Sequence, residues 1–398
     1  MFRGYTCTPH VDELTLGYAV WMQLAPEARP EPGGDVITII DRETGRLSHW
    51  PPAPNDELDQ RYIERRENAV GSHQTADPVA ELRREAHRRV SPSIAAHITL
   101  GGRLFRARGA KGDQELHHHP IIERLLSMIS TGYQTRGVER HAELLVISDA
   151  LHEADKTRAA AGEDPLTLDE ARNLLEHAYI ETFHIRETGD PLGGQTSEFC
   201  PTCSDVLFVL SVIPEIDRSY RELFQRTSGR DPMPGLFPPE VAWALSAAGW
   251  DPRTTEQRGA RSVDLMRRIE ATEGREFTQE LFPAAVAAWA EFYDIICVRN
   301  SRGVAHRVRQ FHIGADSTGH LADALHELGT IVGARMFPLG IEGFDEAVLV
   351  IDERGRVFAL DQGGEWFIGD TIYSALTALI TGQAAARIRD DGTWEAEQ

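Results

Sequence analysis

A histidine, a glutamate and two cysteines stand at spacings that favour a metal site. His141 and Glu143 open one expected helix as a His-x-Glu motif, and Cys200 and Cys203 open another, beginning 59 positions after the histidine. Cysteines at i and i+3 share one face of the first helical turn, where the helix dipole favours their thiolate forms. One histidine and two thiolates supply three zinc ligands and leave a fourth coordination position open, as in catalytic zinc sites.

Glu143 is expected to handle protons rather than to bind the metal. It stands two residues after His141, within reach of a water at the open position. Zinc lowers the pKa of a bound water to about 7, so hydroxide is available at neutral pH. The four residues together predict a hydrolytic zinc enzyme in which Glu143 is the general acid and base.

Other interpretations of the same residues stay open. The Cys-x-x-Cys pair could be redox-active, although no thioredoxin-like context surrounds it. A structural zinc would need a fourth protein ligand, which His184 or the run His117–His119 could supply. His141 alone could be an ordinary surface histidine.

The two motifs together resemble the YwqJ-like branch of the bacterial toxin-type deaminases. The resemblance covers about Val90–Pro214 and rests on Arg140–Leu144 (RHAEL) and Ser197–Ser204 (SEFCPTCS). It implies a cytidine-deaminase-like, three-layer α/β/α domain. The charged stretch after Pro214 follows the second motif helix at once, so we expect a sheet that is short or completed by another domain.

The resemblance also implies a reaction and the residues that perform it. His141, Cys200 and Cys203 match the Zn²⁺ ligands of the family, and Glu143 matches its proton shuttle. The implied reaction is hydrolytic deamination at C4 of a cytosine or C6 of an adenine. The substrate contains a nucleobase, as a free nucleotide, single-stranded DNA or RNA.

Further side chains are candidates for substrate binding. The aromatic rings of Phe105, Tyr133 and Phe199 could stack on a flipped or single-stranded base, or they could be core residues. Ser197 and His119 are additional candidates, the histidine for a substrate phosphate. A concentration of basic residues could form a phosphate-facing rim or a solvated surface balanced by acidic neighbours: Arg83, Arg84, Arg88, Arg89, Arg103, Arg106, Arg108 and Lys111.

The C-terminal part of the chain resembles the SUKH superfamily, in particular its third subgroup. The matching segments are Trp243–Arg253, the expected turn Phe337–Gly340, Val348–Phe358 and Gly369–Gly382. The resemblance implies an α+β domain that serves mainly as a toxin-neutralising immunity protein and binds a protein partner through its sheet surface. Near the N-terminus, Gly33–Gly45 resembles part of another small bacterial immunity-type domain.

The fold class is therefore multidomain, with α/β and α+β parts. We expect a small α/β unit at 1–65, the deaminase domain at 90–214, a linker at 215–236 and the SUKH-like domain at 237–384. Two hairpins are expected, at 36–50 and 94–108, with a further strand at 179–185. Helices are expected at 56–65, 121–129, 141–161, 168–177, 200–213, 241–248, 283–293 and 371–381, and a frayed tail from 387.

The composition excludes several classes of protein. The 398 residues are 41% hydrophobic and 26% charged, as in soluble globular proteins. The formal net charge is −21, from 41 basic and 62 acidic residues, so the whole chain is not a general nucleic-acid binder. No apolar run could span a bilayer, no secretory signal is recognisable, and only four cysteines are present, so we expect a cytoplasmic protein without membrane contact.

Two functions from different classes fit this organisation. The first is a zinc-dependent nucleobase deaminase in a bacterial toxin–immunity context, which the complete set of His, Glu and two Cys favours. The second is an immunity or partner-binding protein with a non-catalytic deaminase-like scaffold, because a neutralising-type domain follows in the same chain. A third hypothesis joins the two: the C-terminal domain restrains the deaminase until something displaces it.

Overall fold

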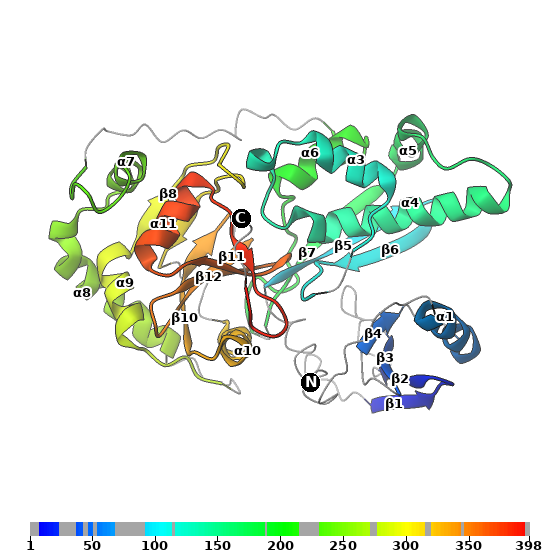
Figure 1. Ribbon diagram of the computed structural model, residues 1–398, viewed down its shortest axis with the longest axis horizontal. Coiled ribbons are helices and arrows are strands. Elements are labelled where there is room, and N and C mark those ends of the chain that lie inside the picture. The colour runs from blue at the N-terminus through cyan, green and yellow to red at the C-terminus, as the bar shows by residue number, and fades with distance from the viewer. Residues whose placement is uncertain are drawn as a thin grey trace. The chain divides into compact units, whose positions relative to one another are not determined.

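The protein is described here from a computed structural model, and the chain divides into two compact units, Met1–Arg89 and Val90–Gln398 (Figure 1). None of the described helices is long and apolar enough to cross a membrane. The structure describes residues 8–23, 37–42, 47–50, 54–67, 92–113, 116–187, 189–214, 231–270, 277–314, 320–343 and 346–394. The arginines expected at positions 83, 84, 88 and 89 of a basic rim, and most of the expected linker at 215–236, lie outside these residues.

The first unit holds a four-stranded antiparallel sheet and one helix. The strands follow one another in the order β1 (Thr8–Glu13), β2 (Gly17–Gln23), β3 (Ile37–Asp41) and β4 (Leu47–Trp50), with α1 (Asn55–Glu67) after them. Its small core includes Ile39 and Leu58, which are fully buried. The Tyr62 hydroxyl donates to the buried Asp41 carboxylate at 2.6 Å, which ties the helix to the sheet.

The second unit begins with a domain built on three antiparallel strands in the order β6-β5-β7. We call the described residues from 92 to 214 the middle domain. Its strands are β5 (Ser93–Leu100), β6 (Arg103–Arg108) and β7 (Tyr179–Ile185). Its helices are α3 (Pro120–Met128), α4 (Ala142–Ala160), α5 (Leu168–Leu175) and α6 (Pro201–Val209), with single 3-10 turns at Thr131–Tyr133 and Val138–Arg140.

The core of the middle domain lies between its sheet and its helices. Ile98 on β5 and Leu144 and Ile147 on α4 are fully buried there, as the helical spacing of the apolar residues predicts. Helix α6 is shorter than expected, because the chain turns out of the helix at Ser211, whose φ is 61°. The expected hairpin at 94–108 and the expected strand at 179–185 are confirmed.

The rest of the unit is a seven-stranded antiparallel sheet with helices on both faces. We call the described residues from 231 to 394 the C-terminal domain, and its sheet order is β14-β13-β12-β11-β10-β9-β8. The strands are β8 (Ile295–Cys297), β9 (Phe311–Ile313), β10 (Met336–Glu342), β11 (Ala347–Asp352), β12 (Val357–Asp361), β13 (Gly364–Gly369) and β14 (Ala386–Arg387). The helices are α7 (Pro239–Ala247), α8 (Thr255–Glu270), α9 (Pro283–Phe292), α10 (Ala322–Val332) and α11 (Ile372–Thr381).

The strands at the centre of this sheet are buried on both faces. In β11, Leu349 and Ile351 join the core under α7, α8, α9 and α11, whereas Val348 and Val350 join a second core with α10. This alternation follows from the two-residue repeat of a strand, and it explains why the sequence of β11 is apolar at nearly every position. The fold is therefore mixed helix and sheet throughout, as the sequence predicts.

Two sequence expectations in this domain are wrong. Phe337–Gly340 is part of strand β10 and not a turn, since a β-bulge between Pro338 and Gly340 accommodates both residues within the strand. The tail is not frayed as far as residue 394, because Ile388 is buried and the Trp394 ring stacks on Phe367 at 5.1 Å between centroids.

We predict that Phe292→Ala destabilises the C-terminal domain by about 3–5 kcal/mol. The Phe292 ring is fully buried and contacts the rings of Phe237, Trp250 and Tyr373, so its removal leaves a cavity among rigid neighbours. Urea unfolding followed by tryptophan fluorescence measures the change. Val286→Ala on the same helix is the control, because Val286 is 41% exposed and its truncation should cost under about 0.5 kcal/mol.

Candidate functional site

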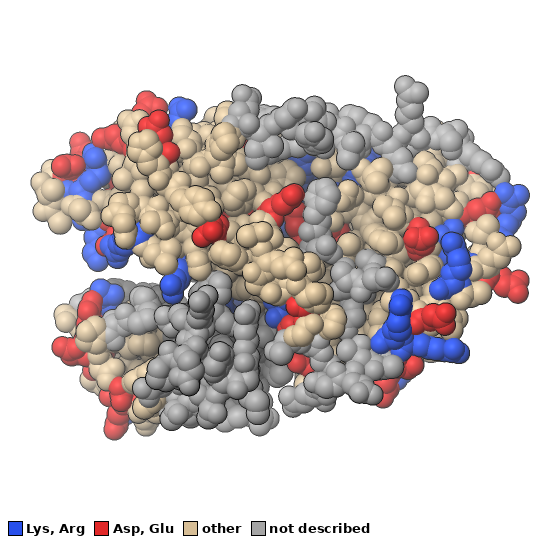
Figure 2. All heavy atoms as spheres, turned by 180° about the vertical axis from the view of Figure 1, so that it is seen from behind, with Lys and Arg blue, Asp and Glu red and all other residues tan. Residues whose placement is uncertain are grey.

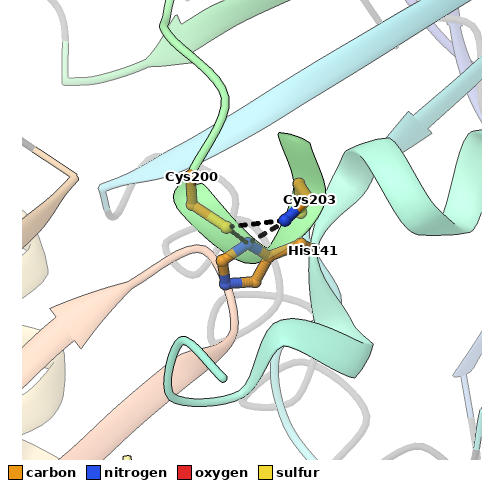
Figure 3. Close-up of side chains that lie close together, drawn as sticks. All are labelled: His141, Cys200 and Cys203. Atoms are coloured by element: carbon orange, nitrogen blue, oxygen red, sulfur yellow. Dashed lines mark hydrogen bonds between the residues drawn. The ribbon is translucent and has the colours of Figure 1, made fainter. Parts of the chain in front are cut away.

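Three side chains from two helix starts form a compact buried cluster (Figure 3). The Nδ1 atom of His141 lies 3.5 Å from the Sγ atoms of both Cys200 and Cys203. The three ligand atoms lie within 4.8 Å of one another, and all three residues are buried. Residues separated by 59 positions in the sequence therefore meet as the motif spacing predicts.

The local sequence explains why both helices begin at this point. His141 is the N-cap of α4, and Cys200 is the N-cap of α6 with Pro201 at the first helical position, where its missing N–H is no loss. The Cys203 N–H donates to the Cys200 sulfur at 3.3 Å, as a capping side chain requires. The positive ends of two helix dipoles thus converge on the cluster and favour thiolate.

Arg140, in the same motif as His141, anchors the approach to α4. Its buried guanidinium donates to the carbonyls of Ala110 and Gly112 at 2.8 and 2.6 Å. Thr202, between the two cysteines, receives the Thr135 N–H at 2.8 Å. These bonds fix the segment before His141 to α6 and to the residues that follow β6, a role that the motif residues do not reveal by type.

The charges inside the cluster are strongly coupled. Burial acts to raise the pKa of the Cys200 thiol, but hydrogen bonding from Cys203 and the charge of His141 outweigh it and hold that pKa well below its usual value. Burial and the neighbouring Cys200 thiolate raise the pKa of Cys203 well above its usual value. Burial opposes the charged form of His141, yet the Cys200 thiolate raises its pKa to about 9.

Glu143 lies on the first turn of α4 with its carboxylate turned into the protein. The residue is 1% exposed, and neither buried carboxylate oxygen has a hydrogen-bond partner among the residues that the structure describes. Burial raises the pKa of Glu143 to about 7, although the charge of His141 opposes that rise. A buried carboxylate without partners is costly in a folded protein, so it points to a ligand or water that belongs between Glu143 and the cluster.

The cluster fits a zinc ion by its donor set. One imidazole nitrogen and two cysteine sulfurs are ligands that zinc prefers, and the convergent helix dipoles and burial suit a cation held by thiolates. Among the residues that the structure describes, no fourth histidine, cysteine or carboxylate joins the group. The alternative of a structural site completed by His184 or His117–His119 therefore receives no support from the described side chains.

The residues expected to contact substrate occupy different surroundings. Ser197 and Phe199 lie on the loop that leads into Cys200, with Phe199 packed against the core of the middle domain. Tyr133 is 37% exposed, and the Arg302 guanidinium of the C-terminal domain lies over its ring at 5.8 Å from the centroid. His119 caps α3, and its ring pairs with Asp155 at 2.9 Å.

The expected basic rim is balanced by acidic neighbours where it is described. Arg103 pairs with Glu153 at 2.8 Å and lies over the Phe105 ring at 5.1 Å from the centroid. Lys111 lies 3.7 Å from Glu365 of the C-terminal domain and is itself buried. On the face drawn in Figure 2, the described basic and acidic side chains are likewise interspersed. The Arg103 pair favours a charge-balanced surface at the start of β6, whereas the buried Lys111 belongs to the contact with the C-terminal domain.

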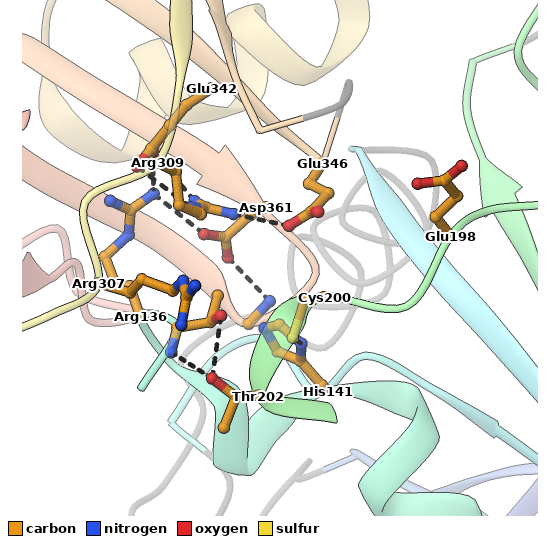
Figure 4. Close-up of polar contacts among 12 residues, drawn as sticks. Arg136, His141, Glu198, Cys200, Thr202, Arg307, Arg309, Glu342, Glu346 and Asp361 are labelled. Carbon is orange, nitrogen blue, oxygen red and sulfur yellow. Dashed lines mark hydrogen bonds and ion pairs between the residues drawn. The ribbon is translucent and has the colours of Figure 1, made fainter. Parts of the chain in front are cut away.

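A second charged network, contributed by the C-terminal domain, adjoins the cluster (Figure 4). The Arg136 guanidinium, five residues before His141, donates to Glu342 at 2.8 Å and to Asp361 at 3.2 Å, and all three side chains are at most 5% exposed. Arg309 pairs with Glu342 and with Glu346 at 3.1 and 2.8 Å. Sequence reasoning did not find this network, because its members lie more than 150 positions apart from Arg136.

The network controls the protonation of its members. Burial acts to raise the pKa of Glu342, but the charges of Arg136 and Arg309 lower it to about 2. Burial raises the pKa of Glu346 to about 6 against the charge of Arg309. Burial and the charge of Arg136 lower the pKa of His306 to about 4, so this histidine is neutral at pH 7.

Comparison with family models identifies three segments of the chain. Residues 79–212 match the YwqJ-like deaminase family, residues 237–382 match the SUKH-3 immunity protein family, and residues 2–69 match the immunity protein 35-like domain. No curated protein and no solved structure matches the chain significantly. Both resemblances drawn from the motifs are confirmed, and the N-terminal segment matches an immunity-type domain, as the residues Gly33–Gly45 suggested.

We predict that the purified chain binds about one zinc ion, and that Cys203→Ser reduces this to a small fraction. The serine hydroxyl is a poor replacement for one of three thiolate or imidazole donors. Metal content by mass spectrometry gives the answer. Cys297→Ala is the matched control, because Cys297 is also buried but lies in β8, outside the cluster. Equal zinc in both variants would contradict the assignment.

We also predict a loss of stability in acid that depends on His306. Its folded pKa of about 4 lies below the usual 6.5, so the unfolded chain takes up the proton first as the pH falls. The contribution of the neutral His306 ring to the free energy of unfolding is therefore fully present above pH 6.5 and is lost as the pH falls towards 4. Between pH 7 and 5 the free energy of unfolding should fall by about 1–2 kcal/mol more in wild type than in His306→Asn.

Urea unfolding at pH 7, 6 and 5 measures this difference. The exposed His117, changed to asparagine, is the control and should leave the pH dependence as in wild type. If the free energy of unfolding of His306→Asn changes with pH as in wild type, the folded protein does not lower the pKa of His306.

Proposed function

We propose that this protein is a zinc-dependent hydrolytic deaminase that acts on a nucleobase, cytosine or adenine, in a nucleotide or nucleic acid. The match of residues 79–212 to the YwqJ-like deaminases gives the reaction class. The observation that carries the proposal is the unpartnered Glu143 carboxylate beside the cluster of His141, Cys200 and Cys203. The SUKH-3 match supports a toxin–immunity context for this activity.

His141, Cys200 and Cys203 would hold the metal. Zinc bound there supplies Lewis-acid activation of water at neutral pH. The helix N-termini of α4 and α6 stabilise the thiolates that bind it, and Arg140 and Thr202 keep the two helix starts in register.

Glu143 would perform the proton transfers. Its carboxylate accepts a proton from the attacking water and then delivers it to the amino group of the base, which leaves as ammonia. Burial without a competing hydrogen-bond partner leaves both oxygens available for this exchange. Phe199 and Ser197, on the loop before Cys200, are the proposed substrate contacts nearest to the cluster in the sequence.

Protein binding is a second function that the comparisons favour. Two of the three matched segments are immunity-type domains, one at each end of the chain. We propose that the C-terminal domain also recognises a protein partner. Pull-down with purified deaminase toxins, compared with the same toxins carrying altered surfaces, tests this role independently of catalysis.

We predict that Glu143→Gln lowers ammonia release by about 10²–10⁴-fold, because the amide cannot accept and return the proton. Zinc content should stay near that of wild type, since Glu143 is not among the metal-binding side chains. The measurement is ammonia release over a panel of nucleosides, nucleotides, single-stranded DNA and RNA, with metal analysis of the same samples.

Glu163→Gln, beyond the end of α4, is the control and should keep full activity. Full activity in Glu143→Gln would rule out the proposed proton shuttle. Loss of zinc from that variant would instead give Glu143 the role of a metal ligand.

A further inference from the structure

We propose that the C-terminal domain is a built-in inhibitor of the metal site, which it closes by binding the segment 130–142 that leads into His141. This inference rests on the proposed function for its activity measurement only, because closure itself is measured by the rate at which Cys200 and Cys203 are alkylated. The segment 130–142 is then a binding partner of the C-terminal domain within the same chain.

The C-terminal domain makes hydrogen bonds to backbone groups of the segment 130–142 at three positions. The Gly303 N–H donates to the Gly132 carbonyl and the Arg307 N–H donates to the Gln134 carbonyl, each at 2.9 Å. The Gln362 side chain accepts the Ala142 N–H at 3.0 Å in a buried position. Ala142 lies between the metal-binding His141 and Glu143, so this last bond reaches the active centre itself.

Arg136 supplies the central side-chain contact of the same segment. Its guanidinium is enclosed by the carboxylates of Glu342 and Asp361 and lies over the Trp366 ring at 5.7 Å from the centroid. Gly137 has a φ of 63°, and a Cβ there would lie 2.5 Å from the Trp366 ring. Only glycine lets the two domains approach this closely, which shows that the surfaces are shaped for each other.

Two further contacts hold the domains together, through residues outside the segment 130–142. The Glu187 carboxylate of the middle domain accepts the Asp323 and Ala324 N–H groups at 3.3 and 2.7 Å, and so caps the N-terminus of α10 across the interface. The Arg387 guanidinium donates to the Asp113 carboxylate at 2.7 Å. The interface is therefore polar, buried at its centre and held by several independent groups.

The reacting groups are buried while the C-terminal domain contacts the segment 130–142. His141, Cys200 and Cys203 are 3%, 1% and 0% exposed, and the Glu143 oxygens are buried. A base must touch the carboxylate that moves its protons, so substrate can enter only after the C-terminal domain has moved away from the segment 130–142. Deamination and the domain contact are therefore mutually exclusive.

The test uses the full chain and variants of the interface. Gln362→Arg puts a cation into the buried interface and removes the acceptor for the Ala142 N–H, whereas Gln362→Glu keeps an acceptor. Asp113→Arg breaks the ion pair with Arg387, and the double variant Asp113→Arg/Arg387→Glu restores it with reversed charges. The readout is alkylation of each cysteine by iodoacetamide in the presence of EDTA, resolved by peptide mass spectrometry.

We expect Cys200 and Cys203 to be alkylated about tenfold faster in Gln362→Arg, the change in open population that loss of a buried hydrogen bond brings. Asp113→Arg should show a smaller increase, which the charge-reversed double variant cancels, and Gln362→Glu should behave as wild type. Cys297 is the internal control, since it is buried in the C-terminal domain and reacts only if that domain unfolds.

Equal alkylation of Cys200 in wild type and in Gln362→Arg would overturn the proposal. Activity on the nucleotide panel gives an independent decision: a rise in the opened variants supports inhibition, and loss of an activity that wild type possesses shows that the C-terminal domain completes the active site instead. Faster alkylation without activity in any variant would support closure and contradict the deaminase assignment, so the two failures are distinguishable.

Discussion

The convergence of two helix N-termini in a buried place is the constraint on which the rest of the structure depends. It brings one imidazole, two thiols and a carboxylate together in the buried interior. Such a group of polar side chains is stable only if charges compensate one another or a cation joins them. The positive ends of α4 and α6 supply part of that compensation, and the segment around Arg140 and Thr202 holds the two helix starts at the required separation.

Buried charges are also compensated across the boundary between the middle and C-terminal domains. Arg136 is buried, so removing it from water costs more than a single ion pair returns, and two carboxylates and an aromatic ring surround it. The carboxylates come from strands β10 and β12, whose register is set by the C-terminal sheet, so that sheet must be formed before it can enclose Arg136. The middle domain itself has a sheet of only three strands among its described residues, in the order β6-β5-β7.

Much of the local structure could be predicted from the sequence, because local signals determine it. The caps at Thr167 and Cys200, the alternating residues of β7 and the Gly101–Gly102 turn all indicate their elements within a few residues. Strand β10 was missed because its proline and glycine are typical of turns, and only the bulge makes them compatible with a strand. The contacts of Arg136 with Glu342 and Asp361 join residues more than 200 positions apart, and no local pattern records such pairing.

The covalent connection of the two domains changes what the interface must achieve. Modules joined in one chain meet each other at an effective concentration of about a millimolar, so even contacts too weak to hold separate proteins together remain formed. A free competitor for the Arg136 surface displaces the tethered domain only when the ratio of its concentration to its Kd exceeds the same ratio for the tethered domain at its effective concentration. Synthesis of both domains in one polypeptide also fixes their ratio at one to one, so every cluster of His141, Cys200 and Cys203 is made together with the domain that contacts it.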